Sequence, residues 1–203
     1  MSDSTLNSSL LIRVQLHDSA AWQRLVQLYE PVILKWARKA GLRDADAADV
    51  VQEVMRAVMR AIGNFCRDQP GDTFRGWLWT ITRNKILDWR RGQEQQALAT
   101  GGTAAFLQLH ELPETPAESE AGTENFAIFC KALELLKLDF QPQTWTAFWR
   151  VAIENASPDE VAAELNISRN SVYVAKNRCL KRLREELANL VEIDGFWPKG
   201  VKE

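Results

Sequence analysis

The hydrophobic residues of this chain recur every three or four positions over most of its length, a period typical of amphipathic α-helices. In the first such stretch, residues 18–40, the apolar positions are Trp22, Leu25, Val26, Tyr29, Val32, Ile33 and Trp36. We expect Asp18 or Ser19 to cap this helix and Gly41 to end it. Pro31 lacks a backbone donor, so a bend is predicted there.

A second amphipathic pattern begins at Asp44 and predicts another helix. Its apolar face consists of Val50, Val51, Val54, Met55, Val58 and Ile62. Most of its charged residues fall on the opposite face, namely Asp46, Asp49, Glu53, Arg56 and Arg60. Residues 63–72 then contain Gly, Asn, Pro and Asp, a composition that predicts a loop.

The third predicted helix starts at Asp72 or Thr73, ends at about Arg91 and combines aromatic with basic side chains. One stripe, expected to be buried, contains Phe74, Trp77, Leu78 and Ile81, and a different side contains Trp79, Arg83, Ile86 and Arg90. Aromatic rings beside cations suit single-stranded nucleic acid, because each unstacked base gains about 1–3 kcal/mol by stacking on a ring. For Trp77 the core is the better interpretation, since a small domain needs large apolar side chains.

The whole pattern predicts an all-α fold of two small helical domains joined by a flexible acidic linker. We place the domains at residues 1–92 and 125–193, the linker at 93–124 and a tail at 194–203. The linker is too polar to form a core of its own. Helical periodicity returns near Phe126, and no convincing β-alternation or internal repeat is present.

Residues 157–187 predict a helix-turn-helix motif. The segment Ser157-Pro158-Asp159-Glu160 supplies a capping serine, a proline at the first helical position and a glutamate that closes a capping box. Asn166 tolerates the left-handed conformation that ends a helix. Ser168 is expected to cap a second helix running to about Leu190, the helix that such motifs place in the major groove of DNA.

The second helix of this motif has six basic residues and no acidic one between Ser168 and Arg184. Its apolar stripe, expected to pack inward, consists of Val172, Cys179, Leu180, Leu183 and Leu187. Residues at the start of such a helix meet base edges, and cations further along meet phosphates. An ordinary helical hairpin with a solvated basic face is the alternative interpretation.

Composition adds an uneven distribution of charge to this picture. The formal net charge is −2, yet Lys+Arg against Asp+Glu is 14 to 11 over residues 1–97, 2 to 7 over 98–140 and 9 to 9 over 141–203. Such asymmetry often marks nucleic-acid binding. The cysteines and histidines are isolated, so we expect no disulfide framework, metal site or cofactor. With no signal peptide and no apolar run of ~20 residues, we expect a cytoplasmic protein without membrane insertion.

Three stretches, in this order, resemble the small extracytoplasmic-function (ECF) type of bacterial RNA polymerase sigma factor, within the sigma-70 family. Residues 46–62 resemble the helix of its region 2, with an Asp-x-x-Gln-Glu-Val signature that begins at Asp49. Residues 74–91 resemble the Phe-Arg-x-Trp-Leu helix that follows, and residues 157–187 resemble region 4. The resemblance covers most of residues 18–91 and 141–190.

This resemblance implies a promoter-specificity subunit that directs core RNA polymerase and assists promoter melting, without catalysis of its own. The residues implied to bind the polymerase β′ subunit are Asp46, Asp49, Gln52, Glu53 and Arg56. Those implied to bind the melted −10 element are Asn64, Phe65, Arg67, Arg83, Asn84, Lys85, Asp88, Arg90 and Arg91. Those implied to bind the duplex −35 element are Ser168, Arg169, Asn170, Ser171, Tyr173, Lys176, Asn177, Arg178, Lys181 and Arg182. The implied partners are promoter DNA and the β′ and β subunits of core polymerase, with an anti-sigma factor as a further candidate.

The sequence departs from the family pattern in the recognition helix, where we expect Ala175 to leave a gap at a position that commonly holds a cation. A rival hypothesis is a stand-alone helix-turn-helix regulator with an N-terminal helical dimerisation or sensor domain, which would bind palindromic sites as a dimer. A nucleic-acid enzyme is the weakest hypothesis, because the sequence has no Gly-rich phosphate loop, metal-ligand cluster or nucleophile–base pair.

Overall fold

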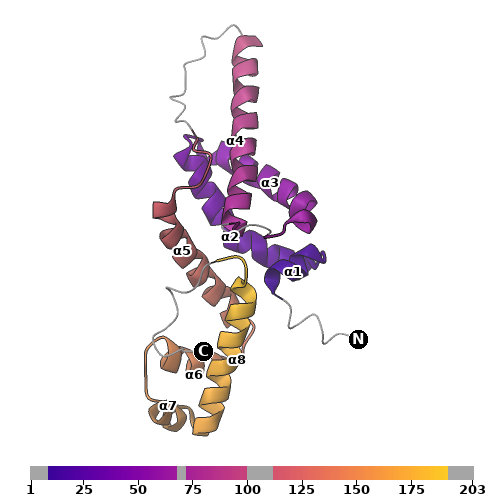
Figure 1. Cartoon of the computed structure of the whole chain (residues 1–203). Helices are drawn as coiled ribbons and strands as arrows, with labels where there is room; N and C mark the ends of the chain where they lie inside the picture. The colour runs from indigo at the N-terminus through magenta and orange to yellow at the C-terminus, as the bar shows by residue number, and fades with distance from the viewer. Residues whose placement is uncertain (1–8, 68–71, 100–111, 192–203) are drawn as a thin grey trace. The chain divides into compact units, whose positions relative to one another are not determined.

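The computed structural model describes residues 9–67, 72–99 and 112–191, and every regular element in these ranges is a helix (Figure 1). The predicted all-α fold is confirmed. The chain divides into two compact units, one of residues 14–124 and the other of residues 1–13 together with 125–203. The predicted tail and the linker residues 100–111 lie outside the described ranges.

Four α-helices precede the linker: α1 (Leu10–Gln15), α2 (Ser19–Lys39), α3 (Asp44–Ala61) and α4 (Phe74–Ala99). Asp18 caps α2 as predicted, since its carboxylate accepts hydrogen bonds from the backbone of Ala20 and Ala21 at 2.9 and 3.1 Å. Such a cap stabilises a helix by about 1 kcal/mol. Gly41 has φ 89°, a left-handed conformation that suits glycine and turns the chain towards α3. The short helix α1 was not predicted.

Aromatic side chains dominate the core of the unit of residues 14–124. The predicted apolar face of α3 is buried, as is that of α2 except for the half-buried Trp22 and Val26. The largest rings meet where α2, α4 and the loop after α3 come together. Phe74 lies 5.0 Å from Tyr29 and 5.5 Å from Phe65 between ring centroids, both edge to face. Edge-to-face pairs of this kind add about 0.5–1.5 kcal/mol beyond the area they bury.

The prediction of which side of α4 is buried was partly wrong. Phe74 and Leu78 are buried as expected, but Trp77 and Ile81 are only half-buried. On the different side, Trp79, Ile86 and Arg90 are buried, at 5%, 0% and 8% exposed, and Arg83 is half-buried. Periodicity identified an amphipathic helix, but α4 has hydrophobic residues on more than one side.

The predicted linker is shorter than expected because helices extend into it from both ends. Helix α4 continues to Ala99 rather than ending at Arg91, and α5 (Glu118–Lys137) begins before the expected end of the linker. No Gly or Pro lies between Gly92 and Ala99 to stop α4.

The C-terminal helices are α6 (Pro142–Ala152), α7 (Pro158–Leu165) and α8 (Arg169–Leu187). Their shared core consists of Ala147, Val161, Val172 and Ala175, with Val151, Ala156, Ala162, Leu165 and Ile167 packed against it. The predicted capping box is present at α7. The Ser157 hydroxyl accepts a hydrogen bond from the Asp159 amide, and the Glu160 carboxylate accepts one from the Ser157 amide. Helix α8 ends three residues earlier than predicted.

Candidate nucleic-acid and polymerase interfaces

The turn between α7 and α8 is defined by polar groups at both helix ends. Asn166 has φ 51° and ψ 48°, the left-handed conformation that its sequence position predicted. The Ile167 amide then donates to the carbonyl of Ala162 at 3.0 Å, while the Ile167 side chain packs on the core. Ser168 accepts from the Ser171 amide at 3.0 Å and starts α8. The predicted helix, turn and second helix are therefore present.

The first turn of α8 is open to solvent. Ser168, Arg169, Asn170 and Ser171 are exposed, and Tyr173 is 39% exposed. The Arg169 guanidinium lies 5.7 Å from the centre of the Tyr173 ring, donates to its hydroxyl at 3.3 Å and lies 3.4 Å from an Asp159 carboxylate oxygen. These contacts hold Arg169 at the end of the helix that enters a groove in motifs of this kind.

Ala175 does not leave a gap on the exposed side of α8, contrary to the prediction. It is 7% exposed and belongs to the core of the motif with Val172, three residues earlier. Residues three apart share a face of an α-helix, so Ala175 continues the buried stripe rather than the surface one. The neighbouring Val174 is the exposed residue, at 57%.

The cations further along α8 differ in how open they are. Arg178 and Lys181 are exposed, although Arg178 lies 5.8 Å from the centre of the Phe140 ring and Lys181 lies 3.8 Å from Glu185. Arg182 has a side chain only 19% exposed and lies 3.4 Å from a carboxylate oxygen of the fully buried Glu186. Its charge is thus largely compensated within the helix. Asn177 is exposed and Lys176 half-buried.

The residues assigned to polymerase form one surface of α3. Asp49, Gln52, Glu53 and Arg56 are all exposed, whereas Asp46 is half-buried and pairs with Arg43 at 3.1 Å. Arg56 pairs with Glu53 and also donates to the Gln52 side chain at 3.4 Å. The spacing of three and four places these polar residues along one side of the helix, and the exposed Met59 follows them one turn later. This surface is polar, ordered and accessible.

Most residues assigned to the melted −10 element lie at the surface. Asn64, Arg67, Asn84, Asp88 and Arg91 are exposed, and Arg83 and Lys85 are half-buried. Asn64 ends the 3₁₀-helix η2 (Ile62–Asn64), and Arg67 donates to the carbonyl of Asp72 at 2.8 Å across the loop. Asp88 lies between Lys85 at 3.8 Å and Arg91 at 3.4 Å.

Two residues of that set were placed wrongly by the sequence. Phe65 is 8% exposed and packs against Phe74 and Trp77, at 5.5 and 5.1 Å between centroids. Arg90 is 8% exposed and donates to the carbonyl of Ala40 at 2.8 Å, at the C-terminal end of α2. Burial lowers the pKa of Arg90, and the negative end of the helix dipole offers it a partner. Both side chains are buried in contacts between helices, whereas the prediction required them to be accessible.

Residues 112–124, which we call the strap, form a polar cluster that the sequence did not predict. Glu124 is 2% exposed and accepts from Trp36 Nε1 at 2.9 Å, Arg75 Nε at 2.7 Å and Lys35 Nζ at 3.4 Å. Glu120 pairs with Lys35 at 3.0 Å and with Lys39. Hydrogen bonds from Lys39 and Lys35 lower the pKa of Glu120. The acidic segment, visible in the charge count, is thus held by cations of α2 and α4.

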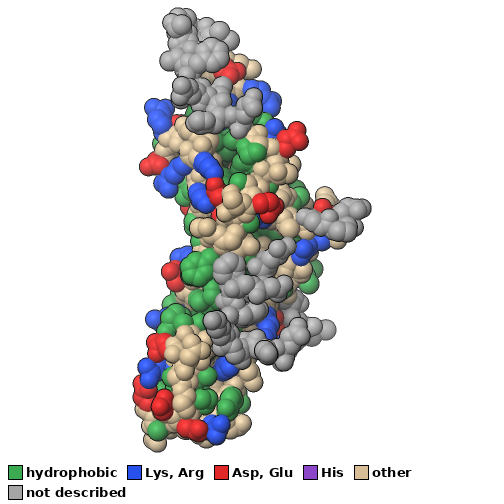
Figure 2. Space-filling view, turned by 60° about the vertical axis from the view of Figure 1, so that its left-hand side comes forward, with side chains coloured by type: hydrophobic (Ala, Val, Ile, Leu, Met, Phe, Trp, Pro, Cys, Tyr) green, Lys and Arg blue, Asp and Glu red, His purple; other side chains and the backbone are tan. Residues whose placement is uncertain are grey.

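Backbone carbonyls of the strap complete this cluster. Arg75, Trp79 and Arg83 recur every four residues on one side of α4 and donate to the carbonyls of Ala117 at 3.1 Å, Pro113 at 3.2 Å and Leu112 at 3.4 Å. Figure 2, which turns the left-hand side of Figure 1 forward, shows Lys and Arg side chains beside Asp and Glu side chains in the upper part of the view. The strap therefore covers one side of the helix that was expected to meet single-stranded nucleic acid.

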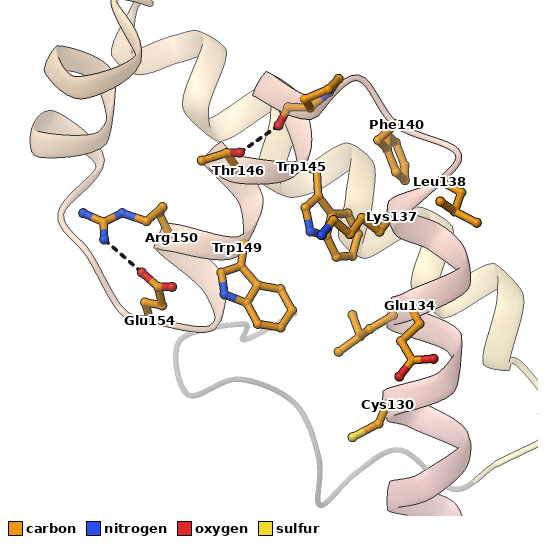
Figure 3. A pocket seen from close by; sticks show the side chains of 12 residues that line it. Cys130, Glu134, Lys137, Leu138, Phe140, Trp145, Thr146, Trp149, Arg150 and Glu154 are labelled. Carbon is orange, nitrogen blue, oxygen red and sulfur yellow. Dashed lines mark hydrogen bonds and ion pairs between the residues drawn. The ribbon is translucent and has the colours of Figure 1, made fainter.

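A cavity of about 680 Å³ lies between the second half of α5 and α6 (Figure 3). Leu133, Trp145 and Trp149 supply apolar walls, while Glu134 and Arg150 lie among the residues around it. Leu138, which also borders the cavity, is 83% exposed. An apolar hollow beside an exposed leucine is typical of a surface that receives another apolar side chain.

Two classes of site are absent from the described part of the chain. No three His, Cys, Asp or Glu side chains converge there in a way that could hold a metal ion. None of the described helices combines the length and hydrophobicity that a membrane crossing requires.

Comparison with known proteins identifies the family. The Sigma-70 region 2 family model matches residues 25–96, a range that contains most of α2, all of α3 and most of α4. The ECF RNA polymerase sigma factor SigE of Mycolicibacterium smegmatis is 29% identical over 180 residues, which are 83% of this chain and 62% of SigE. RNA polymerase sigma factor NccH of Alcaligenes xylosoxydans is 33% identical over 91 residues, which are 45% of this chain and 47% of NccH. The chain thus spans less than two thirds of either relative.

Another relative is matched over most of its length. RNA polymerase sigma factor CnrH of Cupriavidus metallidurans is 30% identical over 179 residues, which are 86% of this chain and 88% of CnrH. The solved structure of CnrH in complex with the cytosolic domain of CnrY is matched at 24% identity and a TM-score of 0.35, over 86% of this chain and 92% of that one. The chain therefore belongs to the sigma-70 family of bacterial RNA polymerase sigma factors, within its ECF type.

Proposed function

We propose that this chain directs core RNA polymerase to particular promoters and assists their melting, as a subunit without catalysis of its own. Family membership is the observation that carries the proposal. This function places the protein in the cytoplasm, with the polymerase and the DNA.

Within this proposal, the α3 surface binds the β′ subunit of core polymerase. Its support is the exposed group Asp49, Gln52, Glu53 and Arg56, which lies inside the segment matched by the region 2 family model. Exposed charges on a protein surface can give specificity for a partner with complementary charge and raise the rate of association with it. The cavity between α5 and α6 is our candidate for a second protein contact, with the β subunit or an anti-sigma factor, because the apolar Leu138 at its border is 83% exposed.

The two DNA contacts are proposed for different forms of DNA. The open first turn of α8, with Arg169, Asn170 and Ser171, suits the major groove of a duplex −35 element. The loop from Asn64 and the exposed polar residues of α4 suit the unstacked bases of a melted −10 element. Phe65 and Arg90 are left out of this second set because both are buried.

The experiment is promoter-dependent initiation by sigma-free core polymerase after addition of the purified chain. We expect initiation with the wild-type chain and a loss of about tenfold or more in core affinity for Glu53→Lys, because like charges across an interface cost several kcal/mol. Glu94→Lys, the same reversal at an exposed position of α4, is the matched control and should retain core binding.

Failure of the wild-type chain to bind core polymerase would contradict the proposal. A dimer that binds palindromic duplex sites without polymerase would instead support a stand-alone helix-turn-helix regulator. Equal core affinity for wild type and Glu53→Lys, with initiation intact, would move the polymerase surface away from α3 and leave the function standing.

A further inference from the structure

The strap is held on α2 and α4 by polar contacts rather than by close packing. Glu120, Glu124 and three backbone carbonyls make all the hydrogen bonds described above. Of the strap residues before α5, only Leu112 and Pro116 are half-buried, and the residues between and after them are exposed. The pairs of Glu120 with Lys35 and Lys39 are accessible to water, and such pairs weaken with salt and contribute little. The Glu124–Arg75 pair is buried instead, so breaking it costs more.

A cavity of about 360 Å³ remains beneath the strap. Trp36 and Trp79 line it from the helices, and Pro113, Pro116 and Ala117 line it from the strap. Because this pocket is partly open to solvent, the strap and the helices are not closely packed there, and close packing contributes much of the stability of a segment. The residues of the strap before α5 thus have few apolar contacts, a feature typical of segments that open locally.

The surface under the strap, which we call the strap face, combines aromatic rings with cations. Its members are Lys35, Trp36, Lys39, Arg75, Trp79 and Arg83. Trp36 and Trp79 lie edge to face at 5.2 Å, and the Arg75 guanidinium lies 5.9 Å from the centre of the Trp36 ring. Rings for bases and cations for phosphates are the two elements of single-strand binding.

The strap supplies acidic and carbonyl oxygens to this surface, as a strand of nucleic acid would supply phosphate oxygens. Glu120 and Glu124 lie four residues apart on α5 and reach the cations of α2 and α4 together. While they do so, Trp36 and Trp79 are only 4% and 5% exposed. A strand could reach the two rings only if the strap left.

We propose that the strap face is a binding surface for single-stranded DNA, and that the acidic strap occupies it until a strand displaces the strap. The surface differs from the polar residues of α4 assigned to the −10 element, with which it shares only Arg83. The inference rests on the proposed function in one respect, because a melted promoter is the source of the strand.

The test is the affinity of the full chain for a labelled oligothymidylate of about ten nucleotides. The double variant Glu120→Gln/Glu124→Gln weakens the strap, and we expect it to bind about fivefold more tightly than wild type or better. Glu114→Gln/Glu118→Gln is the matched control, because both glutamates are exposed strap residues and the net charge changes equally. An equal gain for both double variants would overturn the proposal, since it would reflect net charge alone.

Cations of the strap face provide a second comparison. Adding Lys39→Gln to the first double variant should remove most of the gain, whereas adding Arg38→Gln should remove little. Arg38 is adjacent, similarly exposed and paired with Asp44 instead of the strap. Equal losses from the two additions would place the strand elsewhere and overturn the proposal.

A measurement on the wild-type chain guards against variants that fail to fold. Cleavage by a glutamyl protease after Glu120 and Glu124 requires the strap to open, so saturating oligothymidylate should accelerate it about threefold or more. Cleavage that is unchanged or slower would overturn the proposal. Promoter-dependent initiation by the wild-type chain would still support the proposed function in that case, so the two failures are distinguishable.

Discussion

The two basic regions of this protein differ in what their cations already contact. On α2 and α4, Lys35, Lys39 and Arg75 are held by glutamates of the strap. At the start of α8, Arg169 and its neighbours face solvent, with only exposed contacts to Asp159 and Tyr173. Under the two proposals, the helix-turn-helix can meet duplex DNA directly, whereas the strap face must first lose the strap. Basic residues in a sequence indicate available charge only where the fold leaves that charge open.

The buried ion pair under the strap offers the largest effect. Glu124→Ala would leave the Arg75 side chain, 10% exposed, without its carboxylate, so we expect the free energy of unfolding of the N-terminal unit to fall by about 3–5 kcal/mol. Urea unfolding followed by circular dichroism measures it. Asp44→Ala is the control, because this aspartate lies in the same unit, pairs with Arg38 while 82% exposed and should cost at most about 1 kcal/mol. Similar losses of unfolding free energy in the two variants would contradict the claim that the buried ion pair contributes more than the exposed one.

The second effect concerns Ala175 in the helix-turn-helix. Ala175→Lys introduces a long side chain into the shared core of α6, α7 and α8, so we expect a loss of about 1–3 kcal/mol or more together with weaker binding to duplex DNA. Val174→Lys, one residue earlier and 57% exposed, should change stability by about 0.5 kcal/mol or less. If Ala175→Lys instead kept full stability and bound DNA more tightly, the position would be DNA-facing after all.

A third comparison lies within α8. Lys181 is 65% exposed, so Lys181→Gln should reduce the salt dependence of duplex binding by about one unit of slope if this lysine meets a phosphate. Arg182 is 19% exposed and neutralised by Glu186, so Arg182→Gln should change the slope much less. Titration of binding at several salt concentrations measures both. A larger change for Arg182→Gln would reverse this assignment.

The smallest effect is the pH dependence of the strap. Because hydrogen bonds from Lys39 and Lys35 lower the pKa of Glu120, its contribution to stability is present above the usual glutamate pKa and is lost as the pH falls through the lowered value. Burial acts to lower the pKa of Lys35, but Glu120 and Glu124 raise it overall. The contribution of Lys35 to stability is therefore lost only as the pH rises through this raised pKa. Unfolding at a series of pH values should show a weaker acid dependence for Glu120→Gln than for Glu118→Gln. Identical profiles would remove Glu120 from the cluster.

Local patterns predicted most helices and the ends that have a capping or turn residue, because capping and turn chemistry act over a few residues. They missed α1 and the C-terminal end of α4, which continues past Gly92 to Ala99. Asp18, the Ser157 capping box and Asn166 all have the roles that their spacing indicated. The polar face of α3 was equally readable, since its apolar residues left only one side for Asp49 and Glu53.

Long-range partners could not be predicted in this way. Arg75 and Glu124 are 49 residues apart, and Arg90 and Ala40 are 50 apart, so no local spacing relates them. Phe65 was predicted to bind DNA because it lies in a loop, but its ring packs against Phe74 and Trp77 of α4. Local spacing could not predict this contact either. The sequence offered one indication of these contacts, the acidic stretch that follows a basic helix. It indicates that the two segments attract each other but does not identify which cations the acidic segment covers.

Hydrogen exchange of the full chain, read segment by segment, tests most directly whether two surfaces serve two partners. With core polymerase we predict slower exchange in α3 peptides that contain Asp49 and Glu53, because binding there limits opening of the helix. With duplex promoter DNA we predict slower exchange at residues 168–176 and little change in α3. Core polymerase that bound while exchange in α3 stayed unchanged would contradict this account.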